Sequence, residues 1–329
     1  MRPVCKPLAS PLAGPIGCFV AYKRALNRRF ETEEGVLHCL DRYLVAKGTP
    51  NLASVTPAVI EAFVASRPRP KPRSYNHLLS VLRGLFDWMV DQGMIAASPM
   101  RLRPRRVTAR HIPYLFDLPA ACRLIETAVV LADGVNAPLR GPTYATIFAL
   151  LYGLGLRVGE VVRLTRADVD LDRNILVIRQ TKFAKSRLVP FGPRMAERLR
   201  RFIELRERRT GVLSPEVPVF SFKVGRPISR NTITQTFHGL VPRLGLVPPA
   251  GVASPRLHDL RHSFAVGTLR RWYREGADPA ARLLQLSTFL GHVDPVSTAV
   301  YLTITADLMQ AGAERFARFA SPLSVGGAS

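Results

Sequence analysis

A short stretch of β-type alternation inside an otherwise helical pattern decides the fold class of this chain. Between residues 169 and 191, apolar and polar residues alternate through VDLD, ILVIRQT and RLVPF, with a turn at Arg173 and Asn174 and the short connection KFAKS. Period-two alternation places one face of each run against a core, and connections this short join antiparallel neighbours. We therefore predict a small antiparallel sheet, most simply three-stranded, within a mainly α-helical fold.

Helical patterns fill residues 19–100 and divide into four segments, which are FVAYKRALNRRF, VLHCLDRYLVAKG, VIEAFVAS and SYNHLLSVLRGLFDWMVDQG. Gly48 suits a helix C-terminus, and Thr56 followed by Pro57 suits a helix start. The last segment carries Leu78, Leu82, Leu85, Phe86 and Met89 on one side. Four such helices predict a compact all-α domain.

Proline and arginine mark the predicted domain boundaries. Residues 1–18 contain Pro7, Pro11 and Pro15 and are predicted to be a flexible leader. Residues 101–112 hold five arginines with little apolar periodicity, which predicts a basic linker. The second domain is predicted to span 113–329. The other basic run, RPRPKPRS, fits either a solvated connection or a loop that contacts phosphates.

The charge balance indicates a polyanionic partner. The chain has 329 residues, with 47 Lys and Arg against 24 Asp and Glu, a net charge of +23 at pH 7. Nucleic acid is the leading candidate, with an anionic membrane surface or the ribosome as alternatives. The excess is spread along the chain, since residues 1–120 hold 18 basic and 8 acidic residues and the remainder holds 29 and 16. This distribution suits a long surface that follows phosphates.

The cysteines and the apolar runs bear on where the protein works. Cys5, Cys18, Cys39 and Cys122 form no CxxC pair, which favours a reduced, cytoplasmic protein without a structural zinc site. No run approaches the ~18 apolar residues that a membrane helix needs, so we expect no membrane-spanning helix. With nucleic acid as the leading candidate, no membrane is among the expected partners.

Further helices are predicted in the second domain. The segment LGLRVGEVVRLTRADVD is expected to be a helix that presents Arg157 and Glu160 one turn apart. Near the end, Asp294 can cap a helix that starts at Pro295, and Tyr301 would then lie nearly two turns in. Taken alone, a tyrosine in such a segment is typical of a half-buried packing residue.

Four motifs of the second domain follow one another in a specific order, and they are GLRVGE with Arg157, QTKFAK with Lys182, HDLRH with His258 and Arg261, and LGH-x8-Y with His292 and Tyr301. Together they resemble the tyrosine recombinase (phage integrase) family, over both domains. The resemblance implies a four-helix, SAM-like core-binding domain followed by a catalytic domain of the DNA breaking-rejoining fold with a C-terminal tail helix. It implies a site-specific DNA recombinase, and the HDLRH and LGH segments look similar to integrases of transposons or other mobile elements.

Cleavage of a phosphodiester needs a nucleophile, donors for the non-bridging oxygens and an acid for the leaving oxygen. Guanidinium groups match a phosphate with two parallel donors, and Arg157 and Arg261 can provide them. With enough fixed positive charge, a metal ion becomes unnecessary, so we expect no metal and no other cofactor. A phenol, whose pKa in water is ~10, needs such a site, or a nearby base, to act as a nucleophile.

The resemblance assigns roles at the phosphate. Tyr301 is expected to attack the scissile phosphate and form a 3′-phosphotyrosyl link, which frees a 5′-hydroxyl without ATP. Arg157, Arg261 and His292 are expected to hold the phosphate oxygens. Glu160 matches the acidic residue that follows the first arginine of the family and is expected to orient its neighbours.

The resemblance also assigns the proton transfers. Lys182 is expected to protonate the leaving 5′-oxygen, and His258 to assist proton transfer at the tyrosine. In the family, the turn beside this lysine is commonly rich in glycine, whereas this chain has Phe183 and Ala184 there. Lys185 therefore stays an alternative acid.

The histidines allow other interpretations. His258 and His262 can both be packing residues, which is the interpretation we favour for His262. Two histidines four apart on a helix can also ligate zinc, with His292 as a third ligand. The usual hydrolase motif has Glu where this chain has Asp259, and the charge of Arg261 opposes a dication, so we expect no zinc site.

Two other classes of function stay open, namely a DNA-binding regulator that no longer cuts and a type IB topoisomerase. The complete set of motif residues argues against the regulator. By resemblance, the expected partners are double-stranded DNA, a homo-tetramer on paired sites and other recombinases of the same element. Residues 305–323 are expected to form the tail that docks on a neighbouring protomer.

Overall fold

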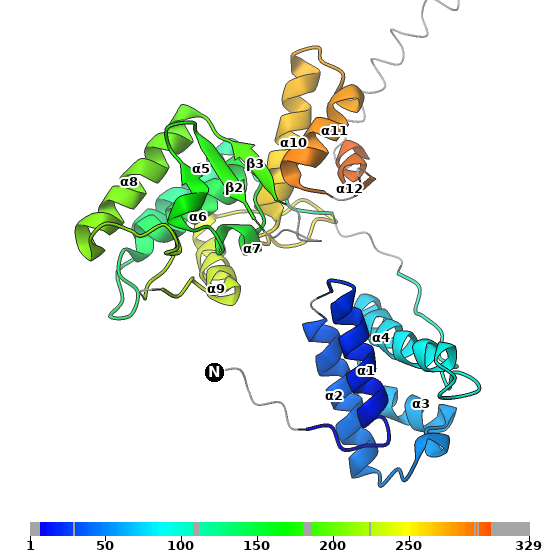
Figure 1. Ribbon diagram of the computed structural model, residues 1–329. Helices are drawn as coiled ribbons and strands as arrows, with labels where there is room; N and C mark the ends of the chain where they lie inside the picture. The colour runs from blue at the N-terminus through cyan, green and yellow to red at the C-terminus, as the bar shows by residue number, and fades with distance from the viewer. Residues whose placement is uncertain are drawn as a thin grey trace, which may run out of the picture. The chain divides into compact units, whose positions relative to one another are not determined.

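The computed structural model describes residues 7–28, 30–107, 112–179, 186–223, 225–292, 294 and 296–303. The chain divides into two compact units, Met1–Arg110 and His111–Ser329 (Figure 1). This division falls within the basic stretch 101–112 that the sequence assigns to a linker.

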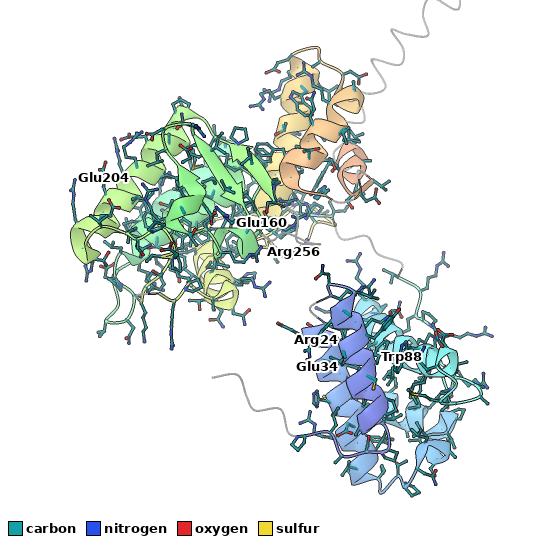
Figure 2. All side chains as sticks on the ribbon, viewed as in Figure 1. Arg24, Glu34, Trp88, Glu160, Glu204 and Arg256 are labelled. Carbon is teal, nitrogen blue, oxygen red and sulfur yellow. The ribbon has the colours of Figure 1, made fainter. Side chains whose placement is uncertain are left out.

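The first unit is a four-helix domain, as predicted, and its elements are α1 (Ala13–Ala25), α2 (Glu31–Ala46), the 3-10 helix η1 (Leu52–Ser54), α3 (Pro57–Ala65) and α4 (Pro72–Asp91). Their apolar faces meet in one core, which includes the fully buried Leu37, Leu40, Phe63 and Leu82. An ion pair of 2.6 Å between Arg24 and Glu34 joins α1 to α2 at the surface (Figure 2).

The predicted leader 1–18 is wrong for the part that the structure describes. Helix α1 begins at Ala13, and the side chains of Leu12 and Ile16 are fully buried in the core. Pro15 lies in the first helical turn, where the missing N–H has no helical partner to lose. The carboxylate of Asp41 accepts hydrogen bonds from the backbone N–H groups of Ala9 and Ser10, which ties the segment before α1 to α2.

The beginning of the predicted linker packs on the first unit. The side chain of Asn76 on α4 accepts from the backbone N–H of Arg105 at 2.7 Å and donates to its carbonyl at 2.8 Å. The guanidinium of Arg105 lies 4.0 Å from the ring centre of Tyr75, and Leu102 packs against the core. Residues 101–105 therefore extend the surface of the helical domain, because a side-chain amide and an aromatic ring hold them.

The second unit is mainly helical, and its elements up to the sheet are α5 (Leu118–Val129), α6 (Arg140–Gly153), α7 (Val158–Val161), η2 (Arg166–Asp168), β1 (Val169–Asp170), β2 (Ile175–Ile178) and β3 (Arg187–Pro190). After the sheet come α8 (Pro193–Thr210), α9 (Arg230–Leu240), η4 (Val241–Leu244), α10 (Asp259–Arg274), α11 (Pro279–Leu290), α12 (Val296–Ala299) and η5 (Val300–Thr303). The strands pair antiparallel in the order β1-β2-β3, which confirms the predicted sheet. Within the described residues, no helix is both long and apolar enough to cross a membrane.

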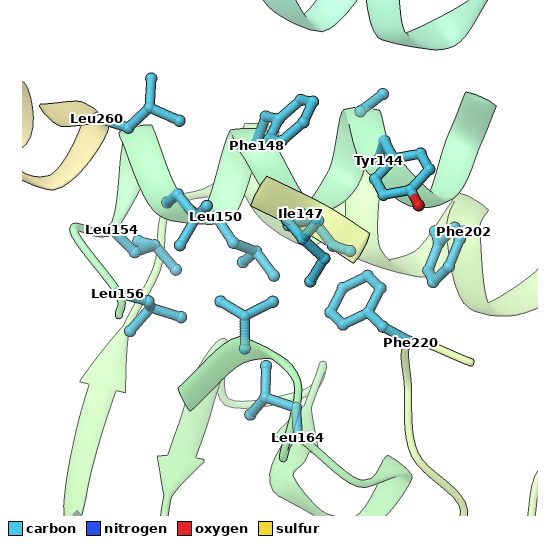
Figure 3. Close-up of a cluster of buried hydrophobic side chains, with 14 of the residues drawn as sticks. Tyr144, Ile147, Phe148, Leu150, Leu154, Leu156, Leu164, Phe202, Phe220 and Leu260 are labelled. Atoms are coloured by element: carbon cyan, nitrogen blue, oxygen red, sulfur yellow. The ribbon is translucent and has the colours of Figure 1, made fainter. Parts of the chain in front are cut away.

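Helix α6 runs through the middle of this unit. Its residues from Tyr144 to Leu151 are all buried, and α5, α8 and α10 pack around it. Figure 3 shows Ile147, Phe148 and Leu150 in the cluster that also takes side chains from the segments beside the sheet. This rigid centre fixes the segment that follows α6, where the first motif arginine lies.

The helix predicted over residues 154–170 is wrong in its extent. Gly155 adopts a left-handed φ of +59°, and a Cβ there would lie 2.5 Å from the ring of Phe264. The chain turns at this glycine, and only the single turn α7 and the 3-10 turn η2 follow. Arg157 consequently stands at the N-cap of α7 rather than on the side of a long helix.

Helices α10, α11 and α12 lie together at one end of the second unit (Figure 1). A small apolar cluster joins α10 and α11 to η5, and it includes Leu269, Leu286, Leu290 and Tyr301. As predicted, Asp294 accepts from the backbone N–H of Val296 at 2.9 Å and begins a helix, but α12 is a single turn that continues as η5. The expected tail at 305–323 lies outside the described residues.

Candidate active site

The C-terminal end of α11 is the place where the site is assembled. The helix closes with Gly291 at a φ of +67°. The backbone N–H of Gly291 donates to Thr288 at 3.0 Å and that of His292 donates to Ser287 at 2.9 Å, a Schellman motif. This turn explains the LGH motif, since the glycine permits the left-handed conformation and the histidine follows it at a fixed position.

Three arginines take the remaining carbonyl groups at this helix end. Arg187 Nε donates to Phe289 O at 2.8 Å, Arg261 Nη2 donates to Leu290 O at 2.7 Å, and Arg157 Nη2 donates to Gly291 O at 2.9 Å. The last carbonyls of a helix have no partners within it and carry the negative end of its dipole. The helix end therefore collects guanidinium groups from α7, β3 and α10.

Glu160, labelled in Figure 2, is the acid that pairs with two of these arginines, Arg157 and Arg187. Its carboxylate accepts from Arg187 Nη1 and Nη2 at 3.0 and 2.9 Å, from Arg157 Nη1 at 2.8 Å and from the backbone N–H of Arg157 at 2.9 Å. Burial on its own raises the pKa of Glu160, but the hydrogen bonds and charges of Arg187 and Arg157 outweigh it and lower the pKa to about 2. Glu160 is thus a fixed anion that holds two cations in place.

Arg261 is a buried cation, with a side chain that is 1% exposed. Its Nη1 donates to Gly155 O at 2.5 Å, in addition to the bond to Leu290. Burial, together with the nearby charge of Arg157, lowers the pKa of Arg261 to about 10, which keeps the group protonated at neutral pH. A guanidinium has more N–H donors than these bonds use, so Arg261 is held in place and can still donate to an anion.

Two histidines beside the arginines are neutral at physiological pH. Desolvation, with the charges of Arg261 and Arg157, lowers the pKa of His292 to about 4. The pKa of His258 is also lowered, by desolvation first and then by His262 and Arg261, although the residue as a whole is exposed to solvent. The ring of His292 is oriented by a bond of 2.6 Å between Nδ1 and Thr298 Oγ1.

Tyr301 is 4% exposed, and its hydroxyl lies 3.0 Å from His262 Nδ1. Burial raises the pKa of the Tyr301 phenol, while the charges of Arg261 and Arg157 oppose this rise. The ring of His292 is stacked beside the Tyr301 ring, with centroids 6.2 Å apart. The phenol is therefore protonated at neutral pH and has a histidine nitrogen at hydrogen-bond distance.

The structure brings together five of the six predicted site residues, which are Arg157, His258, Arg261, His292 and Tyr301. The sixth, Lys182, and its alternative Lys185 lie outside the described residues. The prediction missed two members of the cluster. His262, which we expected to be a packing residue, contacts the tyrosine hydroxyl, and Arg187 holds Glu160.

The zinc interpretation of HDLRH has a specific obstacle in Asp259. This carboxylate is fully buried, accepts from the backbone N–H of Arg256 at 2.9 Å and pairs with its guanidinium at 3.1 Å. It is thus used at the start of α10 rather than beside the histidines. No group of three His, Cys, Asp or Glu side chains in the described part of the chain is placed to hold a metal ion.

The arrangement suits chemistry at a phosphate. Guanidinium groups held by hydrogen bonds supply fixed positive charge, neutral imidazoles supply donors and acceptors, and a phenol lies among them. In a site of low dielectric, such preorganised donors stabilise negative charge that develops on phosphate oxygens.

Comparisons with known proteins identify the family of this chain. The sequence family described as "Phage integrase family" matches residues 133–307. A Sinorhizobium fredii protein named integrase/recombinase y4rB is 32% identical over 306 residues, which cover 91% of this chain and 95% of that protein. Tyrosine recombinase XerC of Xanthomonas campestris pv. campestris is 29% identical over 258 residues, which cover 78% of this chain and 72% of that protein.

Solved structures show the same fold. The Tn1549 transposon integrase in complex with a circular intermediate DNA matches with a TM-score of 0.61 and 17% identity, over 94% of this chain and 100% of that chain. A lambda integrase tetramer bound to a Holliday junction matches with a TM-score of 0.61 and 17% identity, over 88% and 76% of the two chains. The predicted fold class is confirmed.

Proposed function

Because the chain belongs to the phage integrase family of tyrosine recombinases, site-specific recombinases that act on DNA, we propose that it cuts and rejoins DNA through a 3′-phosphotyrosyl intermediate. Tyr301 is the nucleophile in this proposal. The covalent link keeps the energy of the phosphodiester bond, so that rejoining to another strand needs neither ATP nor a metal ion.

One observation carries the proposal, namely the burial of the Tyr301 hydroxyl against a histidine inside the cluster of motif arginines. Arg261 and Arg157 are two cations that favour the ionised form of Tyr301. A tyrosine that served only packing stays protonated, so these charges would not stabilise it. A nucleophilic phenol gains directly, because the same charges stabilise the phenolate as the attack proceeds.

The phosphate is held by Arg157, Arg261 and His292. Both arginines are fixed by carbonyl groups at the start of α7 and the end of α11, which orients their free donors before DNA arrives. Donors that need no reorganisation stabilise the transition state most effectively. Glu160 keeps Arg157 in position and takes no part in bond cleavage.

Two proton transfers complete the reaction. Lys182, or in its place Lys185, protonates the leaving 5′-oxygen, and His258 assists proton transfer at the tyrosine. Both lysines lie on the connection between β2 and β3. Arg187, the first residue of β3, is bonded to Glu160 and to Phe289 of the site, which supports a lysine of this connection as the acid.

We also propose that four copies assemble on paired DNA sites, in the cytoplasm, and that the protein serves a transposon or another mobile element. The likeness to a lambda integrase tetramer on a Holliday junction and to the Tn1549 transposon integrase supports this view. Sedimentation of the full chain with a two-site DNA tests the assembly, and a complex that never exceeds two chains would contradict it.

The chemistry is tested with a nicked suicide substrate, on which a cut strand cannot be rejoined. The full chain is expected to form a covalent protein–DNA adduct in the presence of EDTA, because arginines and not a dication supply the positive charge. Tyr301→Phe is expected to bind the same DNA with nearly unchanged affinity and to form no adduct. An adduct with the Phe variant, or one that requires a divalent metal, would refute the proposal.

Strand exchange separates a recombinase from a topoisomerase of the same chemistry. A substrate with two sites is expected to yield recombined products, whereas relaxation of a supercoiled plasmid without exchange would favour the topoisomerase.

A further inference from the structure

The Tyr301 hydroxyl has a partner that the proposed catalytic set leaves out. His262 lies one turn after His258 on α10, and its Nδ1 is 3.0 Å from the hydroxyl oxygen. The rings of His262 and Tyr301 are tilted by 58°, with centroids 5.5 Å apart. The hydroxyl is therefore within the distance at which a proton can pass to a base.

The other two histidines are engaged differently in the described contacts. The Nδ1 of His292 is bonded to Thr298 Oγ1, and its ring lies roughly parallel to that of Tyr301, with centroids 6.2 Å apart. The ring of His258 lies edge-on to His262, with centroids 4.7 Å apart and planes at 87°. In these contacts His258 thus meets His262, the residue that contacts the tyrosine hydroxyl.

We propose that His262 is a catalytic residue that accepts the Tyr301 proton through Nδ1 when the phenol attacks DNA. This inference rests on the proposed function and deepens it. The role requires the tautomer with hydrogen on Nε2, which leaves the Nδ1 lone pair directed at the hydroxyl. His258 supports His262 through the edge-on contact of their rings.

The step balances in atoms and charge. As the bond from Tyr301 Oη to phosphorus forms, the phenolic proton moves to His262 Nδ1, and the bond from phosphorus to the 5′-oxygen breaks. The leaving oxygen takes its proton from the lysine of the β2–β3 connection. On rejoining, the 5′-hydroxyl gives its proton to that lysine, and the His262 imidazolium returns its proton to the departing phenolate.

The surroundings explain why a base is needed. The phenol is buried, and burial holds its proton on more firmly than water does. Before DNA binds, Arg157 and Arg261 disfavour a further cation in the site. The bound phosphate brings negative charge, which stabilises the imidazolium at the moment when it forms.

The first test uses His262→Gln in the full chain, with single-turnover cleavage of the suicide substrate. Glutamine can still bond to the hydroxyl but cannot take its proton, and we expect cleavage to slow by ~10²–10⁴-fold with unchanged DNA affinity. The matched control is His238→Gln on α9, an exposed histidine that contacts the ring of Phe237 away from the site, and it is expected to cut at the wild-type rate.

His262→Asn is measured in parallel, together with thermal unfolding, because His262 is half-buried and one of the two amides must fit the space. A slow rate in a folded amide variant supports the role of a base, and a wild-type rate in either overturns it. If the wild-type chain itself forms no adduct, the proposed function fails. If the wild type forms the adduct and the amide variants match it, only the assignment of His262 fails.

Two chemical substitutions separate a base from a positioning residue. A fluorinated tyrosine at position 301 has a more acidic phenol and depends less on a base. In a chain that carries it, the fall in cleavage rate caused by His262→Gln is expected to be at least ~10-fold smaller, as Brønsted behaviour requires. An unchanged loss would mean that His262 only positions the tyrosine.

A substrate with sulfur in place of the bridging 5′-oxygen has a leaving group that needs no proton. The fall in cleavage rate caused by His262→Gln is expected to persist on this substrate. The fall caused by removing the acid, with Lys182→Ala or in its place Lys185→Ala, is expected to disappear. Recovery of His262→Gln on the sulfur substrate would place His262 at the leaving group and overturn the proposal.

Discussion

At the scale of single residues, Glu160 shows how one buried acid organises a basic site. Its carboxylate is almost fully buried and bonds to two guanidinium groups that come from α7 and β3. Glu197 on α8 also bonds to two arginines, Arg200 and Arg201, but its side chain is 47% exposed. The two glutamates have the same kind of partners and differ in burial, so they form a natural comparison.

We expect Glu160→Gln to lower the free energy of unfolding by roughly 3 kcal/mol at neutral pH, because removing one charge of a buried pair leaves the other uncompensated. Glu197→Gln is expected to cost less than about 1 kcal/mol, since water screens an exposed pair. Denaturant unfolding measures both. Equal losses would show that burial does not set the strength of the Glu160 pairs.

The wild type and Glu160→Gln differ in their free energy of unfolding, and the pH dependence of this difference follows from the lowered pKa of Glu160. A carboxyl whose pKa is lowered on folding stabilises the folded state above its unfolded pKa and loses this effect as the pH falls. The advantage of the wild type over Glu160→Gln is therefore expected to be complete above pH 4.5 and to decline as the pH approaches about 2. A difference that grew on acidification would contradict this assignment.

At the scale of elements, the end of α11 acts as the common support of the site. Its Schellman turn uses the carbonyls of Ser287 and Thr288, and the next three carbonyls each accept from an arginine. Segments that are distant in sequence, α7, β3 and α10, are joined at one helix end. A small change in this turn therefore affects Arg157, Arg187 and Arg261 at once.

Gly291→Ala tests this support. A Cβ at residue 291 would lie 2.7 Å from Arg187 Nη1 and 2.9 Å from its Cζ, and Arg187 is held by Glu160 and Phe289. We expect a clear loss of stability and a fall in cleavage rate of at least ~10²-fold, as misplaced catalytic groups produce. Unfolding and single-turnover cleavage are the measurements.

Gly245→Ala is the matched control, because Gly245 has a similar φ of +60° and a Cβ added there would meet no atom within 4 Å. This variant carries only the left-handed strain of about 1–2 kcal/mol and is expected to cleave normally. Equal effects at the two glycines would show that backbone strain, and not the collision with Arg187, is responsible.

At the scale of the whole molecule, positive charge is carried by both units. The helical unit holds basic residues on α4 and on the segment 101–105 that packs beside it, and the second unit holds them on α8 as well as at the site. Each unit therefore carries basic residues that can contact phosphates.

Salt dependence measures this contribution. If the protein neutralises several phosphates, its affinity for a target duplex is expected to fall by ~10³–10⁵-fold between about 50 and 200 mM salt. Gel-shift titrations with Tyr301→Phe keep cleavage from disturbing the equilibrium. A nearly flat dependence would mean that few of the basic residues contact DNA.

The sequence by itself determined the four-helix domain, the three-stranded sheet and most of the site. Helical and alternating periodicities are local, and antiparallel pairing follows from short connections, so these elements were predictable from neighbouring residues. The order of the motifs also identified Arg157, His258, Arg261, His292 and Tyr301. The local pattern failed at two places. It predicted a flexible leader where α1 begins, and it predicted a long helix where the chain turns at Gly155.

Only the tertiary structure decided which of these side chains meet and what they contact. Arg187 has the pattern of an ordinary strand residue, and it enters the site because β3 passes the end of α11. His262 has the pattern of a packing histidine, and its role depends on where η5 places the Tyr301 hydroxyl. The physical reason is the same in both cases, since a contact between residues far apart in the chain is fixed by packing and leaves no periodic trace in the sequence.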